Sequence, residues 1–396
     1  MKKLFQQGLR LLVLAAFCLP SSAIIVANYG VAESAPTGDW DLNWDYVYNY
    51  KNSSSVAVGS HWLLTAAHVA DDGGTGTVVM DGISYYQQQI ISHSAADDPD
   101  NVSLADLALV RFDKPFPGYY PLYSGDFPEI DMVGPRRDQV EEDNRLNAVM
   151  IGYGKTGTVY STTYTEASGG NGVKRWGSNK IDGPDTVDYE VLGAMTYNDG
   201  LQMAFTLGDT AYEAGVGAYD SGGGTFVEEG GIWKLAGINT IRYGTDTDYT
   251  GTFAVSVPAY ATWITQTMDA VTGDADSDGI PNWWEEQAGT NVVTTTDQDG
   301  DGVNGLDEYV ADTDPTDGDD FFEMDDFVVF GNQTVTFDGS TARQYQLLHT
   351  TNDLASTNLT WFASHTNKVW GTGTNSSIVV TNSEKIVFYR LQVTLP

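Results

Sequence analysis

The chain has 396 residues and a formal net charge of −35, with 54 acidic residues against 19 Lys and Arg. So strong a negative charge repels nucleic acid and anionic membrane surfaces, and we exclude both as partners. Its length and 41% hydrophobic content indicate a globular protein of two or three domains, and its 43 Gly favour strands and turns.

Residues 1–23 are typical of a secretory signal peptide. Basic residues precede the apolar run 11–17, and small residues at 21–23 offer a cleavage site. The run is shorter than the ~20 residues of a spanning helix, so we expect no membrane insertion after signal removal. Cys18 lies in this signal and is the only cysteine, so the mature chain has no disulfide. We therefore expect a secreted bacterial protein, periplasmic or extracellular.

Short β-strands are predicted along the first half of the mature chain. Aromatic residues alternate from Trp44 to Tyr50, as in a strand with one buried face. Apolar runs bounded by turn residues predict further strands at 54–59, 62–65, 77–80 and 107–112. Many short strands of this kind indicate a barrel or a sandwich.

The same pattern returns between residues 145 and 265, with Gly-rich turns at 152–157 and 168–172. A helix is predicted after Val257-Pro258, because the apolar residues that follow it share one helical face. Those residues are Tyr260, Trp263, Ile264 and Met268. The sequence therefore predicts two β halves closed by a helix.

One stretch points to chemistry. In Asp220-Ser221-Gly222-Gly223 a serine stands between an acid and residues without side-chain bulk, which leaves its hydroxyl open to substrate. A serine becomes a nucleophile only when a base takes its proton, so a His and an orienting acid are expected. His68 follows an apolar strand and Asp106 opens another. Each residue alone fits a core or turn position, but the three in this order favour a catalytic triad between the two halves.

The blocks Leu64-Thr65-Ala66-Ala67-His68, Asp106-Leu107-Ala108-Leu109 and Asp220-Ser221-Gly222-Gly223 resemble the signature blocks of trypsin-like (chymotrypsin-fold) serine proteases. The likeness covers about residues 24–271. It implies a double β-barrel and a serine endopeptidase that acts on protein or peptide substrates through an acyl-enzyme, with no cofactor for catalysis.

The resemblance also implies the roles of single residues. His68 is the general base, Asp106 orients it and Ser221 is the nucleophile, while the N–H groups of Tyr219 and Ser221 form the oxyanion hole. The family usually has Gly where this chain has Tyr219, and a bulky residue tolerates a positive φ poorly. An alternative therefore stays open, in which an inactive domain belongs to a calcium-stabilised extracellular binding or adhesion protein.

By the same resemblance, the substrate pocket has Gly215 at its floor and Thr240, Arg242 and Gly251 around it. Without an Asp at the floor to select Lys or Arg, we expect cleavage after a small or apolar residue. Three interpretations of Arg242 remain: it narrows the pocket, it meets an acidic side chain, or it is solvated.

The start of the mature chain bears on activation. In the resembled family, the freed amino group of an apolar N-terminal residue inserts beside the Asp that precedes the nucleophile. Cleavage after Ala23 would expose Ile24 in this way, so Ile24 would pair with Asp220 and no separate propeptide would be needed. In the alternative, Asp220 pairs with another side chain.

Residues 273–320 contain 12 Asp and 3 Glu without any Lys or Arg. Oxygen ligands recur at positions 1, 3, 5, 7 and 12 of two loops, with Gly at position 6, as in a Ca²⁺ loop. The segment resembles calcium repeats of the EF-hand-loop or thrombospondin type 3 kind, and a structural Ca²⁺ in each loop is expected. A disordered acidic spacer is the alternative. The predicted ligands are Asp274, Asp276, Asp278, Ile280 (carbonyl) and Glu285, and Asp297, Asp299, Asp301, Val303 (carbonyl) and Glu308.

Strand-like runs return after residue 320 and predict a small β-sandwich over 321–396. No catalytic constellation is visible there, and we expect a binding, anchoring or secretion partner for it. The expected organisation is a protease domain over 24–272, a calcium-binding linker over 273–320 and this C-terminal domain.

Overall fold

The computed structural model describes most of the chain after the predicted signal peptide, which itself lies outside the described residues. None of the helices described combines the length and apolar character needed to span a membrane. Two short helical segments, α1 (Tyr29–Ala32) and η1 (Gly38–Trp40), precede the first sheet. The described residues are 24–27, 29–94, 104–128, 145–168, 172–191, 193–245, 247–287, 294–324, 326–328, 334–351, 359–364, 368–380 and 388–396.

The first barrel is a six-stranded sheet. The apolar runs predicted as strands form its centre and are buried along nearly their whole length, because both of their faces are covered. Helix α2 (Ala67–Asp71) follows the third strand of the chain in this sheet. In sheet order the strands are β2 (Val47–Tyr50), β3 (Ser53–Gly59), β4 (Trp62–Thr65), β7 (Ala108–Phe112), β6 (Ile83–Ser92) and β5 (Thr77–Met80).

The strand predicted from Trp44 begins three residues later. Residues Trp44–Tyr46 form the 3₁₀ helix η2, and β2 starts at Val47. The cause is local, because the side chain of Asn43 accepts a hydrogen bond from the N–H of Asp45 at 3.1 Å. Asn competes for the backbone in this way at turns and caps, so the aromatic alternation gave the wrong structure for the first three residues.

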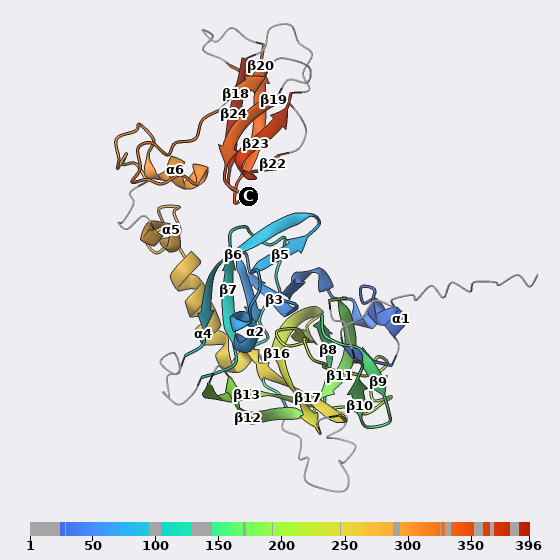
Figure 1. Ribbon diagram of the computed structural model, residues 1–396. Coiled ribbons are helices and arrows are strands. Elements are labelled where there is room, and N and C mark those ends of the chain that lie inside the picture. The colour runs from blue at the N-terminus through green and yellow to red at the C-terminus, as the bar shows by residue number, and fades with distance from the viewer. Residues whose placement is uncertain are drawn as a thin grey trace, which may run out of the picture.

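The second barrel is built on a nine-stranded sheet, in which seven strands form the main path and the other two form a long hairpin attached to the fifth (Figure 1). A separate short pair joins the start of the described chain to the segment before Ser221, through β1 (Ile25–Val26) and β14 (Ala214–Gly215). The main path is β11 (Arg175–Ile181), β8 (Leu146–Gly152), β15 (Gly224–Glu229), β16 (Ile232–Gly244), β17 (Tyr249–Ser256), β10 (Tyr164–Glu166) and β9 (Gly157–Val159), and the hairpin is β12 (Gly183–Val191) with β13 (Ala194–Ala204).

One continuous apolar cluster joins the barrels. It contains Leu64 and Leu109 of the first barrel, and Ile151 and Phe226 of the second. Helix α4 (Val257–Thr272) begins where predicted and buries Trp263 and Ile264 in the same cluster. The prediction of a mainly β protein with a double barrel is therefore confirmed.

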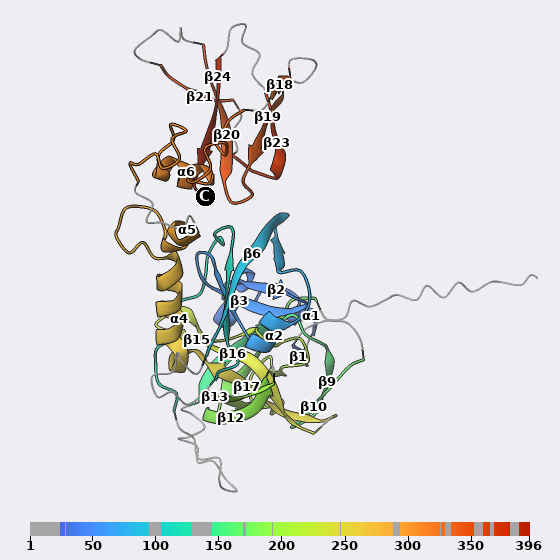
Figure 2. The same cartoon turned by 60° about the vertical axis from the view of Figure 1, so that its left-hand side comes forward.

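Beyond α4 the chain enters the acidic segment and then the C-terminal sheets (Figures 1 and 2). The acidic segment holds two short helices, α5 (Asn282–Gln287) and α6 (Gly305–Ala311). Two sheets follow and share one apolar cluster that includes Phe337, Tyr345 and Ile378. Their strands are β18 (Asp326–Val328), β19 (Thr334–Gly339) and β23 (Gly373–Val379), and β21 (Phe362–Ala363), β20 (Gln344–Thr350), β22 (Val369–Trp370) and β24 (Phe388–Thr394).

Candidate active site

His68 and Asp106 form a hydrogen-bonded pair at the edge of the first barrel. His68 lies on α2, directly after β4, and Asp106 precedes β7, the neighbour of β4 in the sheet. The imidazole Nδ1 is 2.7 Å from Asp106 Oδ2, and the backbone N–H of His68 donates to Oδ1 at 3.0 Å. Both oxygens of the fully buried carboxylate therefore hold the histidine.

This environment raises the pKa of His68 above its ordinary value. Burial by itself lowers the pKa, but the hydrogen bond and the negative charge of Asp106 outweigh it. The side chain is 35% exposed, so the imidazole edge away from Asp106 remains accessible to a substrate. The pair is thus arranged to accept a proton and to stabilise the resulting imidazolium.

The hairpin of the second barrel supports Asp106 from the other side. The hydroxyl of Tyr189, on β12, donates to Asp106 Oδ2 at 2.9 Å. The N–H of Asp106 donates to the side-chain oxygen of Asn198, on β13, at 2.7 Å. Neither residue could be predicted, because a Tyr and an Asn in ordinary strand alternation carry no mark of a partner that lies 83 or 92 positions earlier.

Ser221 lies in the loop between β14 and β15, held close to the first barrel. Its carbonyl accepts the N–H of Ser54 at 3.0 Å. Gly222 follows with φ +83°, and a Cβ there would lie 2.0 Å from the carbonyl oxygen of Ser54. The glycine after the serine is therefore required both by its left-handed conformation and by the close approach of the first barrel.

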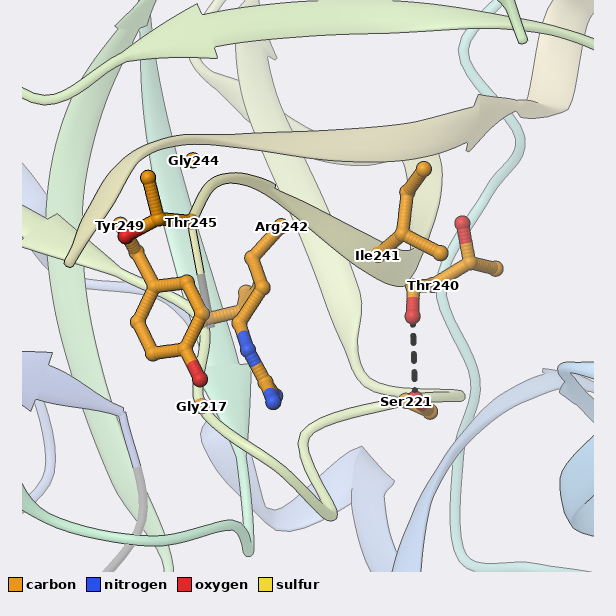
Figure 3. A pocket seen from close by; sticks show the side chains of 9 residues that line it. Gly217, Ser221, Thr240, Ile241, Arg242, Gly244, Thr245 and Tyr249 are labelled. Carbon is orange, nitrogen blue, oxygen red and sulfur yellow. Dashed lines mark hydrogen bonds between the residues drawn. The ribbon is translucent and has the colours of Figure 1, made fainter. Parts of the chain in front are cut away.

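The hydroxyl of Ser221 points to the wall of a pocket. Its Oγ donates to the carbonyl of Thr240 at 3.2 Å (Figure 3). The structure gives no hydrogen bond between Ser221 and His68, although both residues are described. The structure thus joins His68 to Asp106, and Ser221 instead to the strand that borders the pocket.

Tyr219 has a positive φ of +73°, a conformation that a bulky residue tolerates poorly. Among the described residues, the N–H groups of Tyr219 and Ser221 have no hydrogen-bond acceptor, which leaves both available to an oxyanion. The Tyr219 side chain is 43% exposed, and the ammonium of Lys155 lies 5.7 Å from its ring centroid. A left-handed conformation costs a residue with a Cβ ~1–2 kcal/mol, so the loop stores strain at this position.

The acid before the serine is the most enclosed ionisable group of the loop. Asp220 is fully buried, and it accepts the backbone N–H of Gly154 at 2.7 Å, of Gly217 at 2.8 Å and of Ile24 at 3.2 Å. Burial raises the pKa of Asp220 to about 7, against the lowering effect of these hydrogen bonds. The structure thus brings Ile24 to Asp220, at the end of the β1–β14 pair.

A cavity of about 500 Å³ opens beside Ser221. Thr240 and Arg242, predicted for the pocket, are among its lining residues, whereas Gly215 and Gly251 are not. Buried Tyr164 occupies the space in front of Gly215, because a Cβ on that glycine would lie 2.3 Å from the Tyr164 ring. The Tyr164 hydroxyl donates to the carbonyls of Val216 and Gly251, both at 3.1 Å. The sequence gave no sign that Tyr164 closes the base.

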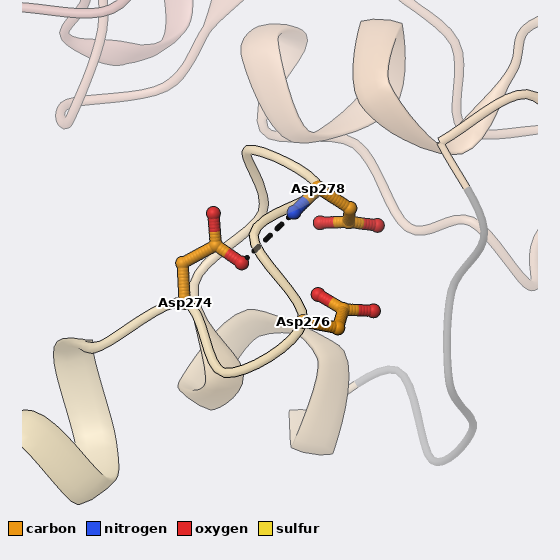
Figure 4. A group of neighbouring side chains, drawn as sticks. All are labelled: Asp274, Asp276 and Asp278. Atoms are coloured by element: carbon orange, nitrogen blue, oxygen red, sulfur yellow. Dashed lines mark hydrogen bonds between the residues drawn. The ribbon is translucent and has the colours of Figure 1, made fainter.

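The two acidic loops repeat one hydrogen-bond pattern. The N–H of Gly279 donates to Asp274 at 2.8 Å, and the N–H of Gly302 donates to Asp297 at 3.0 Å. Both glycines have positive φ, +96° and +101°. In each loop the predicted carboxylates at positions 1, 3 and 5 bring oxygens within 4.8 Å of one another (Figure 4 shows the first loop).

Comparisons with known proteins place most of the barrel region in one family. The family model described as Trypsin matches residues 32–264. None of the curated proteins matches the chain.

Three solved structures illustrate the likeness, all at low TM-scores. Neuropsin, a serine protease expressed in the limbic system of mouse brain, is 18% identical at a TM-score of 0.36, covering 55% of this chain and 89% of that one. A protease from M. tuberculosis in its active form is 15% identical at 0.35, covering 55% and 78%. The passenger domain of plasmid encoded toxin, an autotransporter enterotoxin from enteroaggregative Escherichia coli, is 13% identical at 0.37, covering 59% and 23%.

The assignment rests on the family match, which spans more than half of the 396 residues. The matched segment contains His68, Asp106 and Ser221 and both barrels of the fold. The chain therefore belongs to the trypsin family of serine proteases.

Proposed function

We propose that the chain is a secreted serine endopeptidase with His68, Asp106 and Ser221 as its catalytic triad. The observation that carries this proposal is the 2.7 Å contact between His68 Nδ1 and Asp106 Oδ2, together with the place of Ser221 in the lining of a pocket. The substrates would be proteins or peptides met outside the cytoplasm.

In this mechanism Ser221 Oγ attacks the carbonyl carbon of the scissile peptide bond while His68 takes the hydroxyl proton. The oxyanion forms between the N–H groups of Tyr219 and Ser221. The C–N bond then breaks, and His68 gives its proton to the leaving amine. Water attacks the acyl ester, His68 takes the proton of the water, and the acid product leaves as Ser221 Oγ regains a proton. Asp106 holds the imidazole and stabilises its charged form throughout.

The described geometry differs from this mechanism at the hydroxyl of Ser221. Ser221 Oγ must leave the carbonyl of Thr240 and turn toward the accessible edge of His68. Hydrogen bonds of catalytic groups are often loose before substrate binds and tighten in the complex. The same observation favours a second candidate, a domain of this family that binds without hydrolysis and serves extracellular attachment.

A fluorophosphonate probe separates the two functions, because it reacts only with an activated serine. We expect covalent labelling of Ser221, loss of labelling in Ser221→Ala, and strongly reduced labelling in His68→Ala. A matched control is His349→Ala, which removes a histidine of the C-terminal sheets and should leave labelling unchanged. A folded wild-type chain that takes up no probe contradicts the enzyme and supports the binder.

We further infer that signal cleavage also activates the enzyme. Asp220 is buried among backbone N–H donors and has no cationic partner among the described residues, while Ile24 N already lies 3.2 Å from its carboxylate. Cleavage before Ile24 would turn that N–H into an ammonium and supply the missing positive charge. Mass-spectrometric mapping of the secreted protein should find Ile24 as its first residue. An N-terminus well downstream of Val26 contradicts this inference.

We also propose that the acidic segment binds structural Ca²⁺. The residues fit this ion, because all donors are oxygens and the most enclosed of them lacks a partner. Glu308 is fully buried, and within the described residues neither of its carboxylate oxygens has a hydrogen-bond partner. Asp299 and Asp301 each hold one further buried oxygen in the same condition. Bound Ca²⁺ would neutralise these carboxylates and stiffen the connection between the barrels and the C-terminal sheets.

Isothermal titration of the chelator-treated full chain tests this proposal. We expect Ca²⁺ uptake at two sites, with the second loop weakened roughly tenfold or more in Glu308→Gln, because position 12 supplies two of the ligand oxygens. Glu286→Gln is the matched control, since Glu286 is exposed and lies outside both ligand sets. Absence of Ca²⁺ uptake by the folded chain refutes the proposal.

A further inference from the structure

The pocket beside Ser221 carries a positive charge on its wall. Among its lining residues, Arg242 is the only charged side chain (Figure 3). The remaining surface is made by the segment before Ser221, by neighbouring residues of β16 and by a turn that follows it. The lining residues are Val216, Gly217, Ser221, Thr240, Ile241, Arg242, Gly244, Thr245 and Tyr249.

Arg242 is held in a fixed orientation. Its Cζ atom lies 4.3 Å from the ring centroid of Tyr249, and that tyrosine is only 8% exposed, so it forms a firm platform. One guanidinium nitrogen, Nη1, lies 2.7 Å from Glu166 Oε1. A guanidinium carries five N–H donors in one plane. Glu166 contacts one of these nitrogens, and the Arg242 side chain, which lines the pocket, remains 29% exposed.

Glu166 does not cancel the positive charge at this site. Its Oε1 also accepts the N–H of Ala218 at 2.6 Å, and its Oε2 lies 3.8 Å from the ammonium of Lys155. The carboxylate of Glu166 is therefore shared among three partners, and Arg242 remains the charged side chain that lines the pocket. This positive group lies in a chain whose formal net charge is −35.

The guanidinium of Arg242 determines which substrate side chains bind favourably in the pocket. A Lys or Arg of the substrate would meet Arg242 as a like charge. A large apolar side chain would cover the guanidinium and remove its water without giving it a new acceptor. A carboxylate accepts two parallel N–H donors from a guanidinium, which is the strongest pairing available to it.

Resting on the proposed endopeptidase activity, we propose that this pocket takes an acidic side chain and that the enzyme cleaves after Glu or Asp. Arg242 is the specificity-determining residue. The substrate carboxylate shares the guanidinium with Glu166, which stays attached to the N–H of Ala218. This assignment replaces the small or apolar preference expected from the sequence.

Matched peptides that differ only in the residue before the scissile bond test the assignment. We expect kcat/KM for Glu to exceed that for the isosteric Gln by roughly tenfold or more, since the pairing involves ionised groups, and cleavage after Lys to be weakest. In Arg242→Gln the Glu/Gln ratio should collapse toward one. Lys234→Gln removes a cation from the same strand, outside the pocket, and should keep the wild-type ratio.

A second variant separates a direct charge effect from a change in pocket shape. Glu166→Gln keeps a side-chain oxygen for the N–H of Ala218 but removes the carboxylate that competes for Arg242. It should raise the Glu/Gln ratio above that of the wild type, mainly through a lower KM for the Glu peptide. A ratio that falls in this variant contradicts a direct role for Arg242.

Peptide cleavage and probe labelling together distinguish an error in the specificity from an error in the proposed function. Efficient cleavage after Ala or Leu over Glu, with the same preference in Arg242→Gln, overturns the acidic specificity and leaves the endopeptidase standing. If no peptide is cleaved and Ser221 takes up no fluorophosphonate, the endopeptidase and its specificity both fall.

Discussion

Asp106 accepts hydrogen bonds from both barrels on one carboxylate. Its Oδ2 is shared by His68 Nδ1 at 2.7 Å and by the hydroxyl of Tyr189 at 2.9 Å. The second donor draws electron density from the oxygen that orients the imidazole. Tyr189 is thus a positioning residue, which sets both the geometry and the basicity of His68.

Tyr189→Phe should lower kcat/KM roughly tenfold, because a hydrogen bond to a charged group is lost. It should also raise the pKa of His68, since Asp106 then binds the imidazolium more strongly. Because catalysis needs the neutral imidazole, the acid limb of the pH profile of kcat/KM should move to higher pH. Tyr243→Phe is the control, as Tyr243 donates to Asp185 in the same barrel, at 2.6 Å. If kcat/KM falls but the acid limb of its pH profile does not move, Tyr189 has only a structural role.

Tyr219, in the loop before Ser221, has a left-handed conformation with φ +73°. Tyr219→Gly should therefore stabilise the fold by roughly 0.5–1 kcal/mol, once the greater flexibility of glycine in the unfolded chain is subtracted. Because the donors are backbone groups, kcat should be maintained. Urea unfolding and peptide hydrolysis measure the two effects, and a large fall in kcat would mean that the ring itself serves the reaction.

Asp220 predicts a difference in pH dependence between the uncleaved chain and the chain that starts at Ile24. In the uncleaved chain the folded pKa of about 7 exceeds the unfolded value, which is about 3.9. The folded state then binds the extra proton, so this group costs stability as pH rises from about 4 to 7. A free ammonium at Ile24 should lower the folded pKa and remove that decline.

Urea unfolding of both forms at pH 4.5 and pH 7.5 measures this difference. Asp220→Asn in the uncleaved chain is the control and should show a smaller decline than the uncleaved wild type, because no proton is exchanged at that position. Identical pH dependence of the two wild-type forms contradicts the pairing of Ile24 with Asp220.

At the level of single residues, the sequence predicted those residues that stand in short local motifs. His68, Asp106 and Ser221 stand in short blocks that identify them, and Arg242 lines the pocket as expected. Tyr164 and Tyr189 could not be predicted, because their hydroxyls reach partners on strands distant in the chain. The pocket base is therefore set by a packed aromatic ring, which the glycine pattern around Gly215 does not reveal.

At the level of elements, the loop between β14 and β15 connects Ser221 to the first barrel. A Cβ at Gly222 would lie 2.0 Å from the carbonyl oxygen of Ser54 and 2.1 Å from the hydroxyl of Thr65, and the Ser54 carbonyl belongs to the backbone of β3. Gly230 has a comparable φ of +63° with open space around it. A comparison of these two glycines therefore separates the energetic cost of backbone strain from the cost of close approach by another atom.

Gly222→Ala should destabilise the protein by roughly 3 kcal/mol or more, because overpacking adds to strain. Gly230→Ala should cost roughly 1 kcal/mol from strain alone. Thermal and urea unfolding of both variants give the comparison. Equal costs would mean that the first barrel does not hold the loop as described.

Strands with continuous apolar runs, such as β3, β4 and β7, were predicted within a residue or two. The long hairpin of β12 and β13 was not predicted in detail, although it supplies the supports of Asp106. It is polar on its exposed face and alternates in burial, so its position depends on pairing with β17 and not on its own sequence. Long-range pairing of this kind is what local patterns leave open.

At the level of the whole molecule, the acidic segment contacts the barrel that carries the histidine. Arg111, on β7, lies with its Cζ 4.3 Å from the ring centroid of Trp283 on α5. Thr341, beyond the two acidic loops, donates to Asp113 Oδ2 at 3.1 Å. The predicted metal segment and the C-terminal sheets therefore lie against the first barrel, at the end of the strand that Asp106 precedes.

In the proposed enzyme, the two barrels unite His68, Asp106 and Ser221 into one catalytic unit. The most direct measurement is peptide hydrolysis by Ser221→Ala, by His68→Ala and by the double variant, each verified as folded. We predict that each single change lowers kcat roughly 10⁴-fold or more and that the double change costs no more than either, because the residues act together. Losses that multiply in the double variant, or substantial hydrolysis without Ser221, would contradict a catalytic triad of these residues.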